Sequence, residues 1–228
     1  MRLRNIKGAQ DIIAVSDYVI NIEKYKNKPI FNNSNKIEIE IGMGKGDFII
    51  EKAKQNPHIN FIGIEKYATV LVSVVKKLEK EKLDNLKIIN LDASNITDFF
   101  SKNISKIYLN FSDPWPKKKH ANRRLTSKIF LDKYAKIFKD DYIIEMKTDN
   151  QKLFEYSLQT LSQNGYYFDL VSLDLYANLN EDNIATEYEK KFVKLGNKIY
   201  KLVAIHKVDE KIKNWLLKSC QICYNINE

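Results

Sequence analysis

Along most of this chain, segments with a strand-like pattern of hydrophobic and polar residues alternate with segments of helical spacing. Residues 37–41 alternate apolar with acidic side chains, and the apolar run 61–64 precedes helical apolar spacing over 68–82. The same patterns predict strands at 86–91, 106–111 and 142–146, and helices at 48–55, 127–138 and 151–163. Residues 168–176 and 198–207 predict two long strands with no clear helix between them, as in an antiparallel pair. The order predicts an α/β fold: a mostly parallel sheet with helices on both faces and an antiparallel addition.

Length and charge restrict the class of protein further. The 228 residues are 44% hydrophobic and fit one domain, and the net charge of +9 suits a polyanionic partner. No apolar run reaches the roughly 18 to 20 residues that span a membrane, and no leader pattern opens the chain, so we expect a cytoplasmic protein. Cys220 and Cys223 are too few for a structural zinc site, and we expect ordinary thiols and no metal. Residues 1–35 form a basic N-terminal arm, either an ordered cap or a mobile RNA-contacting tail, and 208–228 a C-terminal helical tail.

Acidic residues and glycines gather where the predicted strands end. Gly42, Gly44 and Gly46 follow the first strand and let the backbone approach a ligand closely, although their spacing is neither a dinucleotide fingerprint nor a P-loop. Glu40, Glu65 and Asp92 end successive strands, where an open parallel sheet binds its ligands. Glu65 is placed to accept from two ribose hydroxyls and Asp92 from an adenine amino group. This set suits a nucleoside with a cationic amino-acid tail, S-adenosylmethionine; the alternative is that Glu40 and Glu65 are solvated strand-end charges.

The segment 110–126 carries the most specific signal. Two prolines stiffen Asp113-Pro114-Trp115-Pro116, which holds a carboxylate and an indole in fixed places. Six cations and no acid follow: Lys117, Lys118, Lys119, Arg123, Arg124 and Lys128. Such a run attracts nucleic-acid phosphates, although it could also be a solvated face. The segment predicts chemistry on a nucleic acid base, with Trp115 either stacking on a base or packing in the fold.

With these residues, the chain resembles the bacterial tRNA (guanine-N7-)-methyltransferase family, which modifies guanine 46 of the tRNA variable loop. The resemblance covers nearly the whole chain and is most specific at residues 40–46, 63–65, 110–126, 146–150 and 186–189. It implies a seven-stranded, Rossmann-like class I methyltransferase domain over residues 36–207, with the last strand antiparallel. S-adenosylmethionine would be the methyl donor and tRNA the partner, and the protein would be a monomer or homodimer.

The resemblance also implies roles for individual residues. Glu40, Glu65, Asp92 and Asp113 correspond to positions that contact S-adenosylmethionine or line its site. Lys117, Asp149, Thr186, Glu187, Tyr188 and Glu189 correspond to substrate-contacting positions, and 119–124 to a stretch assigned to RNA.

Guanine N7 already carries a free lone pair, so its methylation needs no strong base. We therefore expect Asp113 to position the guanine beside the transferring methyl; alternatively, it only caps nearby backbone donors. A carboxylate at Asp113, Asp149 or Glu189 would accept from guanine N1–H and N2–H₂ and reject adenine. Two other functional hypotheses remain: a class I methyltransferase acting on another RNA, a protein or a small molecule, and a non-catalytic RNA-binding relative.

Overall fold

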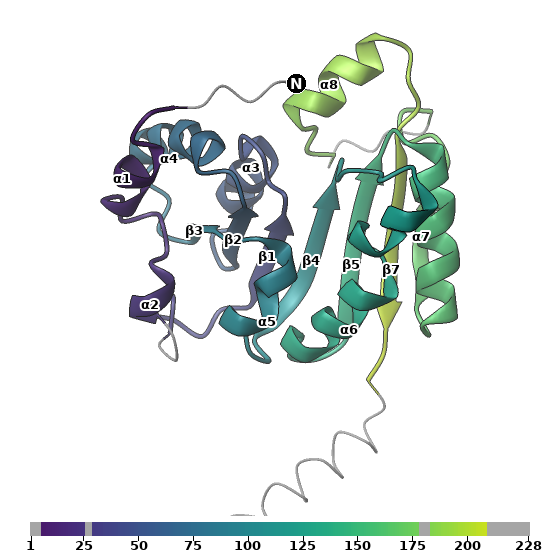
Figure 1. Ribbon diagram of the computed structural model, residues 1–228, viewed down its shortest axis with the longest axis horizontal. Helices are drawn as coiled ribbons and strands as arrows, with labels where there is room; N and C mark the ends of the chain where they lie inside the picture. The colour runs from purple at the N-terminus through teal and green to yellow at the C-terminus, as the bar shows by residue number, and fades with distance from the viewer. Residues whose placement is uncertain (1–5, 26–28, 178–182, 209–228) are drawn as a thin grey trace, which may run out of the picture.

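The computed structural model describes residues 6–25, 29–177 and 183–208, and these form one seven-stranded sheet (Figure 1). The strand order is β3-β2-β1-β4-β5-β7-β6. Neighbouring strands from β3 to β5 pair in parallel, and β7 runs antiparallel to both β5 and β6. The strands are β1 (Ile37–Ile41), β2 (Asn60–Glu65), β3 (Leu86–Asn90), β4 (Ile104–Asn110), β5 (Tyr142–Thr148), β6 (Tyr167–Ser172) and β7 (Tyr200–His206).

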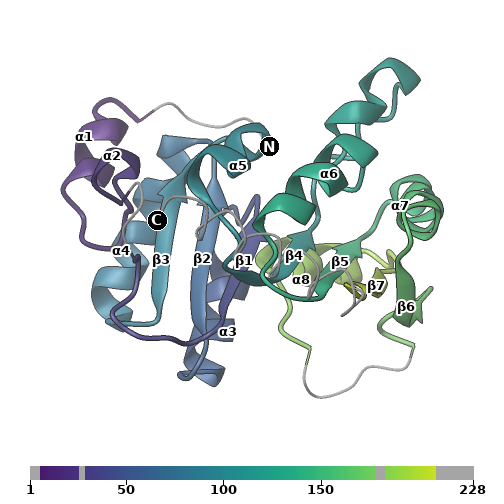
Figure 2. The same ribbon diagram turned by 90° about the horizontal axis from the view of Figure 1, so that it is seen from below.

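Helices cover both faces of this sheet. Helices α3 and α4 lie on one side, and α5, α6 and α7 lie on the other (Figure 2). Helix α8 lies beyond the upper ends of β4 and β5 (Figure 1). The α-helices are α1 (Ala9–Ala14), α2 (Ile22–Tyr25), α3 (Asp47–Gln55), α4 (Ala68–Glu81), α5 (Ile96–Phe99), α6 (Lys128–Ile137), α7 (Gln151–Gln163) and α8 (Glu187–Lys194). Two short 3₁₀ helices, η1 (Ala93–Asn95) and η2 (Lys118–Arg123), complete the described elements.

The predicted class and sheet are confirmed, with one correction near the end of the chain. Strand β1 and helix α7 have the predicted bounds, whereas β6 ends at Ser172, earlier than the predicted strand over 168–176. The expectation that no clear helix separates the last two strands is wrong, because α8 lies between β6 and β7. Its start is fixed by a capping box, in which the Thr186 hydroxyl accepts from the Glu189 backbone N–H and the Glu189 carboxylate accepts from the Thr186 backbone N–H.

Two apolar layers hold the sheet between its helices. All six residues of β2 are buried, which is the expected state of a parallel strand with helices on both faces. Helix α4 buries Leu71, Val74, Val75 and Leu78 against the α3 side, the face that its apolar spacing predicts. Burying a side chain of this size stabilises the fold by about 1.5–3 kcal/mol. The sheet therefore forms a rigid base for the loops at the carboxyl ends of its strands.

The described part of the leading segment packs on the domain. Ile13 and Ile20 are buried, and the Ile20 N–H donates to the Ile88 carbonyl oxygen at 2.8 Å, so residues 18–20 cover the exposed edge of β3. The use of this segment in RNA binding stays a prediction. Apart from Val208, the predicted C-terminal tail with its two cysteines lies outside the described residues. Within the described ranges, no helix is long and apolar enough to cross a membrane.

Candidate active site

The carboxyl ends of β1 to β4 surround a cavity of about 790 Å³. Predicted site residues from four separate loops line it: Gly42, Gly44, Glu65, Asp92, Asp113 and Arg123. Helix α6 contributes Ile129, Phe130 and Lys133 to the opposite wall. A parallel sheet brings these loops together because all of its strands end at the same edge.

The glycine-rich loop after β1 needs its glycines for backbone conformation. Gly42, Gly44 and Gly46 have φ of 75°, 54° and 76°, in the left-handed region that side chains disfavour. An added Cβ at Gly42 or Gly44 would meet no atom within 4 Å, so ligand atoms can approach the backbone there. At Gly46 the added atom would lie 3.1 Å from Val74. Gly46 is also the N-cap of α3. Gly42 and Gly44 therefore shape the cavity, and Gly46 serves helix packing.

Glu65 and Asp92 are held by backbone donors at the end of their strands. Glu65 Oε2 accepts from the Gly44 N–H at 3.2 Å, and its Oε1 accepts from the Tyr67 N–H at 3.0 Å. Asp92 Oδ1 accepts from the Ser94 N–H at 2.8 Å, and this hydrogen bond lowers the pKa of Asp92 below its ordinary value. Both carboxylates are thus fixed in orientation within the cavity lining, and each oxygen has a lone pair left for a ligand hydroxyl or amino group.

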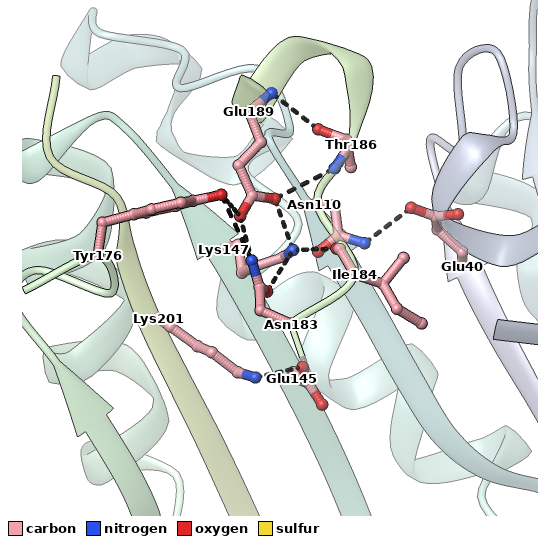
Figure 3. A network of polar contacts seen from close by, with 10 residues as sticks. All are labelled: Glu40, Asn110, Glu145, Lys147, Tyr176, Asn183, Ile184, Thr186, Glu189 and Lys201. Atoms are coloured by element: carbon pink, nitrogen blue, oxygen red, sulfur yellow. Dashed lines mark hydrogen bonds and ion pairs between the residues drawn. The ribbon is translucent and has the colours of Figure 1, made fainter. Parts of the chain in front are cut away.

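Glu40 lies behind the lining, at the end of β1. Its Oε1 accepts from Asn110 Nδ2 at 2.8 Å (Figure 3), and the side chain is only 2% exposed. Burial raises the pKa of Glu40 to about 8, although the Asn110 hydrogen bond and Lys147 oppose that shift. Among the described residues, neither Glu40 Oε2 nor Asn110 Oδ1 has a hydrogen-bond partner. These free oxygens favour a cationic donor, such as an ammonium group, close to them, because a nearby cation also stabilises the carboxylate form of Glu40.

The Asp113 loop has a strained backbone, and neighbouring side chains pack against it. Phe111 and Trp115 have φ of 50° and 42°, values that residues other than glycine seldom adopt. Asp113 lies between them and is exposed in the cavity. Trp115 is half-buried, with the Arg123 guanidinium 4.9 Å from its ring centroid and His120 against its edge at 5.7 Å. The indole is thus partly packed, and one more stacking partner on it stays a prediction.

The cations of the predicted run lie in three different settings. Lys117, Lys118, Lys119 and Arg123 are exposed, on and just before η2, which makes this part of the cavity rim positive. Lys128 is exposed too, but it pairs with Asp132 at 2.8 Å on α6. Arg124 is half-buried, and its guanidinium donates to the carbonyl oxygens of Pro114 and Trp115.

A buried ion pair attaches α8 to the end of β5 (Figure 3). Lys147 Nζ lies 2.6 Å from Glu189 Oε2, and the two side chains are 1% and 0% exposed. Lys147 also donates to the Ile184 carbonyl oxygen, and Glu189 Oε1 accepts from Asn183 at 2.9 Å and from the Tyr176 hydroxyl at 3.1 Å. Burial lowers the pKa of Lys147, and Glu189 opposes that shift. A direct substrate contact by Glu189, as predicted, would require some of these partners to be given up.

Two neighbouring residues attach α8 at other points. Glu187 lies 2.7 Å from Lys45, in the glycine-rich loop, so this exposed pair links α8 to the loop after β1. The Tyr188 hydroxyl donates to Asp149 Oδ2 at 3.3 Å, after β5. Burial and the Asp149 charge raise the pKa of Tyr188 to about 12, so its hydroxyl keeps its proton at neutral pH. The Tyr188 ring lies 5.1 Å from Phe111 of the cavity lining, so Tyr188 links Asp149 to that lining.

Several residues of the site were missed in the sequence. Lys66, Tyr67, Ser94 and Ser112 line the cavity, and each follows or adjoins a predicted acid, so position after a strand was an available signal. No sequence signal indicated Lys147, because a single lysine in an apolar run does not show that its ammonium group is buried. No group of three or more histidine, cysteine or acidic side chains in the described ranges is arranged to hold a metal ion.

The chain has the class I methyltransferase fold: seven strands in this order, with the last antiparallel and a cavity at the carboxyl ends of β1 to β4. Solved structures support the fold. An antibiotic-related methyltransferase superposes with a TM-score of 0.58 at 18% identity, over 91% of this chain and 97% of its own. A variant of the 16S rRNA (adenine(1408)-N(1))-methyltransferase from Catenulisporales acidiphilia, solved with cosubstrate SAM, gives 0.55 at 13% identity, over 91% and 95%.

Sequence comparison identifies the family. The family described as "Putative methyltransferase" matches residues 34–202. The tRNA (guanine-N(7)-)-methyltransferase of Geobacillus sp. (strain WCH70) is 52% identical, over 88% of this chain and 94% of its own. The protein of the same name from Lachnoclostridium phytofermentans is 48% identical, over 90% and 98%. The chain belongs to the tRNA (guanine-N7-)-methyltransferase family and is a methyltransferase.

Proposed function

We propose that this enzyme transfers a methyl group from S-adenosylmethionine to N7 of guanine 46 in the variable loop of tRNA. The observation that carries the proposal is a cavity with three strand-end carboxylates beside an exposed cationic rim, in a chain about half identical to tRNA (guanine-N(7)-)-methyltransferases. A small neutral substrate gives no use for such a rim, whereas tRNA phosphates do.

The residues present fit the methyl donor. Glu65 would bind the ribose hydroxyls and Asp92 the adenine amino group, since both carboxylates are fixed in the lining. The cationic amino-acid part suits the buried acceptors on Glu40 and Asn110 that lack protein partners. When bound, S-adenosylmethionine supplies a methyl group on a positively charged sulfur. Gly42 and Gly44 leave the backbone open to it.

Guanine recognition is assigned to Asp113 and Asp149. Asp113 is exposed in the cavity, and Asp149 is half-buried and orientated by Tyr188, whose ring lies beside Phe111 of the cavity lining. One carboxylate can accept from guanine N1–H and N2–H₂ together, and adenine lacks that pair of donors. We assign this contact to Asp149, because both Glu189 oxygens already have protein partners. Asp113 then holds the guanine beside the methyl group.

The reaction needs no proton transfer at its nucleophile. The N7 lone pair forms the new bond to the methyl carbon while the carbon–sulfur bond breaks, and its electron pair stays on sulfur. The positive charge moves to the purine, so a nearby carboxylate stabilises the product side of the reaction. The protein contributes by holding the reacting atoms in line, beside the strained backbone of the Asp113 loop.

Labelled methyl transfer to unmodified tRNA tests the proposal. The substrate is compared with a tRNA in which guanine 46 is replaced by adenine. We expect transfer to the first only, with the label recovered as 7-methylguanine. Transfer to both tRNAs would contradict the assignment of the position, and transfer to neither would contradict the tRNA activity. Asp149→Asn should lower discrimination against adenine-containing tRNA if Asp149 reads the guanine edge.

A further inference from the structure

Arg124 differs from the other cations of its segment because its guanidinium contacts groups of the protein itself. Its Nε donates to the Pro114 carbonyl oxygen and its Nη2 to the Trp115 carbonyl oxygen, both at 3.1 Å. The guanidinium also lies 4.2 Å from the ring centroid of Tyr156 on α7. Both hydrogen bonds and the stacking face are therefore internal to the protein, whereas Lys117, Lys118 and Lys119 are exposed.

The two carbonyl groups belong to the peptide units on either side of Trp115. Fixing both units fixes the backbone torsions of Trp115, whose φ of 42° lies in the left-handed region. A strained torsion of this kind persists only where surrounding contacts hold it. A planar guanidinium fits two successive carbonyl oxygens, and a lysine ammonium lacks that fork.

The segment that Arg124 holds directly precedes the basic rim, and it adjoins Asp113, the proposed guanine contact. Asp113 is next to Pro114 and two residues before Trp115, and both Asp113 and Trp115 line the cavity. Any relaxation of Trp115 would move the Asp113 carboxylate relative to the cavity, and a misplacement of about 1 Å can cost on the order of 100-fold in rate.

We propose that Arg124 is a positioning residue, which holds the Asp113 loop in its reactive conformation and does not contact tRNA phosphates. This inference rests on the proposed function and adds to it: within one cationic run, the exposed residues bind RNA and Arg124 shapes the active site. It revises the sequence-based expectation that Arg124 belongs to the phosphate-binding set.

The test uses Arg124→Lys, which keeps the charge and loses the fork. We expect kcat for tRNA methylation to fall at least about 10-fold, with KM for tRNA and the salt dependence of tRNA binding unchanged. Arg124→Ala should give the same pattern. Lys118→Ala is the comparison for a phosphate contact: KM rises and the slope of log affinity against log salt falls by about 0.9. A normal kcat in Arg124→Lys, or a reduced salt slope in Arg124→Ala, would overturn the proposal.

A second readout does not depend on the tRNA activity. Trp115 and Trp215 are the two tryptophans of the chain, so Trp215→Phe leaves Trp115 as the only tryptophan, and excitation selective for indole reports on it alone. In that background Arg124→Lys should red-shift the emission, because the released indole becomes more exposed; unchanged emission would count against the proposal. Wild-type protein inactive on tRNA would instead refute the proposed function. If Arg124→Lys fails to fold, Tyr156→Leu, which removes the ring beneath the guanidinium, replaces it in both measurements.

Discussion

Glu40 combines a proposed cofactor contact with an expected effect on stability. It is buried with one hydrogen bond, and burial raises its pKa from an ordinary 4.5 to about 8. In the free protein the carboxyl group is therefore largely protonated at neutral pH. A cationic ligand beside its free oxygen prefers the carboxylate, so we expect S-adenosylmethionine affinity to rise as pH increases through 8. Calorimetric titration between pH 6 and 9 measures this, and an affinity independent of pH would contradict it.

Stability should change in the opposite direction with pH. The native state binds more protons than the unfolded state between pH 4.5 and 8, so the free energy of unfolding falls as pH rises over this range. Glu40→Gln removes this dependence. We expect the variant to be more stable than wild type at pH 9 by roughly 2–5 kcal/mol, and much closer to it at pH 5. Urea unfolding at both pH values gives the comparison, and equal differences at both would exclude Glu40 as the cause.

Single residues also mark the limit of sequence-based prediction at this site. Glu65, Asp92 and Asp113 were predicted to share a ligand site, and the structure brings all three to the lining of one cavity. Their contacts with a ligand stay a prediction. Their position after successive strands was enough, because topology alone brings strand ends together. Glu189 was predicted to contact substrate, but no pattern of residues indicates that Lys147, 42 positions earlier, pairs with its carboxylate. Such long-range partners depend on tertiary packing.

At the scale of elements, α8 is held at the top of the sheet by three consecutive side chains. Glu187 pairs with Lys45, Tyr188 donates to Asp149, and Glu189 pairs with Lys147. The pair at Lys45 is exposed, with side chains 44% and 62% accessible, whereas the pair at Lys147 is fully buried. The buried pair should therefore dominate the attachment of the helix.

Lys147→Met tests this difference. The substitution leaves the Glu189 carboxylate buried without its cation, which should destabilise the protein by about 3–5 kcal/mol. Lys45→Met breaks the exposed pair and should cost less than about 1 kcal/mol. Chemical denaturation of both variants gives the two values. Similar losses for the two would show that burial of the ion pair is not what holds α8.

The helix itself was missed because its signals are weak over eight residues. Residues 187–194 contain only Tyr188, Phe192 and Val193 as apolar side chains, so periodicity did not distinguish the segment from a loop. The pattern Thr186-x-x-Glu189 is a capping box, and it is the one signal in this segment for the start of a helix. Longer elements such as α4 and α7 were predicted because they bury a full apolar face.

At the scale of the whole molecule, the position of charge matters more than its total. The net charge of +9 is spread over many lysines, whereas four exposed cations gather within residues 117–123 at the edge of the cavity. If that rim binds tRNA phosphates, Lys118→Ala/Lys119→Ala should lower the slope of log affinity against log salt by about 2. Lys76→Ala/Lys80→Ala removes the same charge from exposed positions on α4 and should leave the slope nearly unchanged. Equal slopes for the two double variants would show that only net charge acts.

The central claim is that the Asp113 loop is where the methyl donor and the guanine meet. Single-turnover methyl transfer by Asp113→Ala, with S-adenosylmethionine and tRNA both saturating and their binding measured separately, tests it most directly. We expect the rate of transfer to fall at least about 100-fold, while tRNA binding and the unfolding transition stay close to wild type. Near-normal single-turnover transfer by this variant would contradict it.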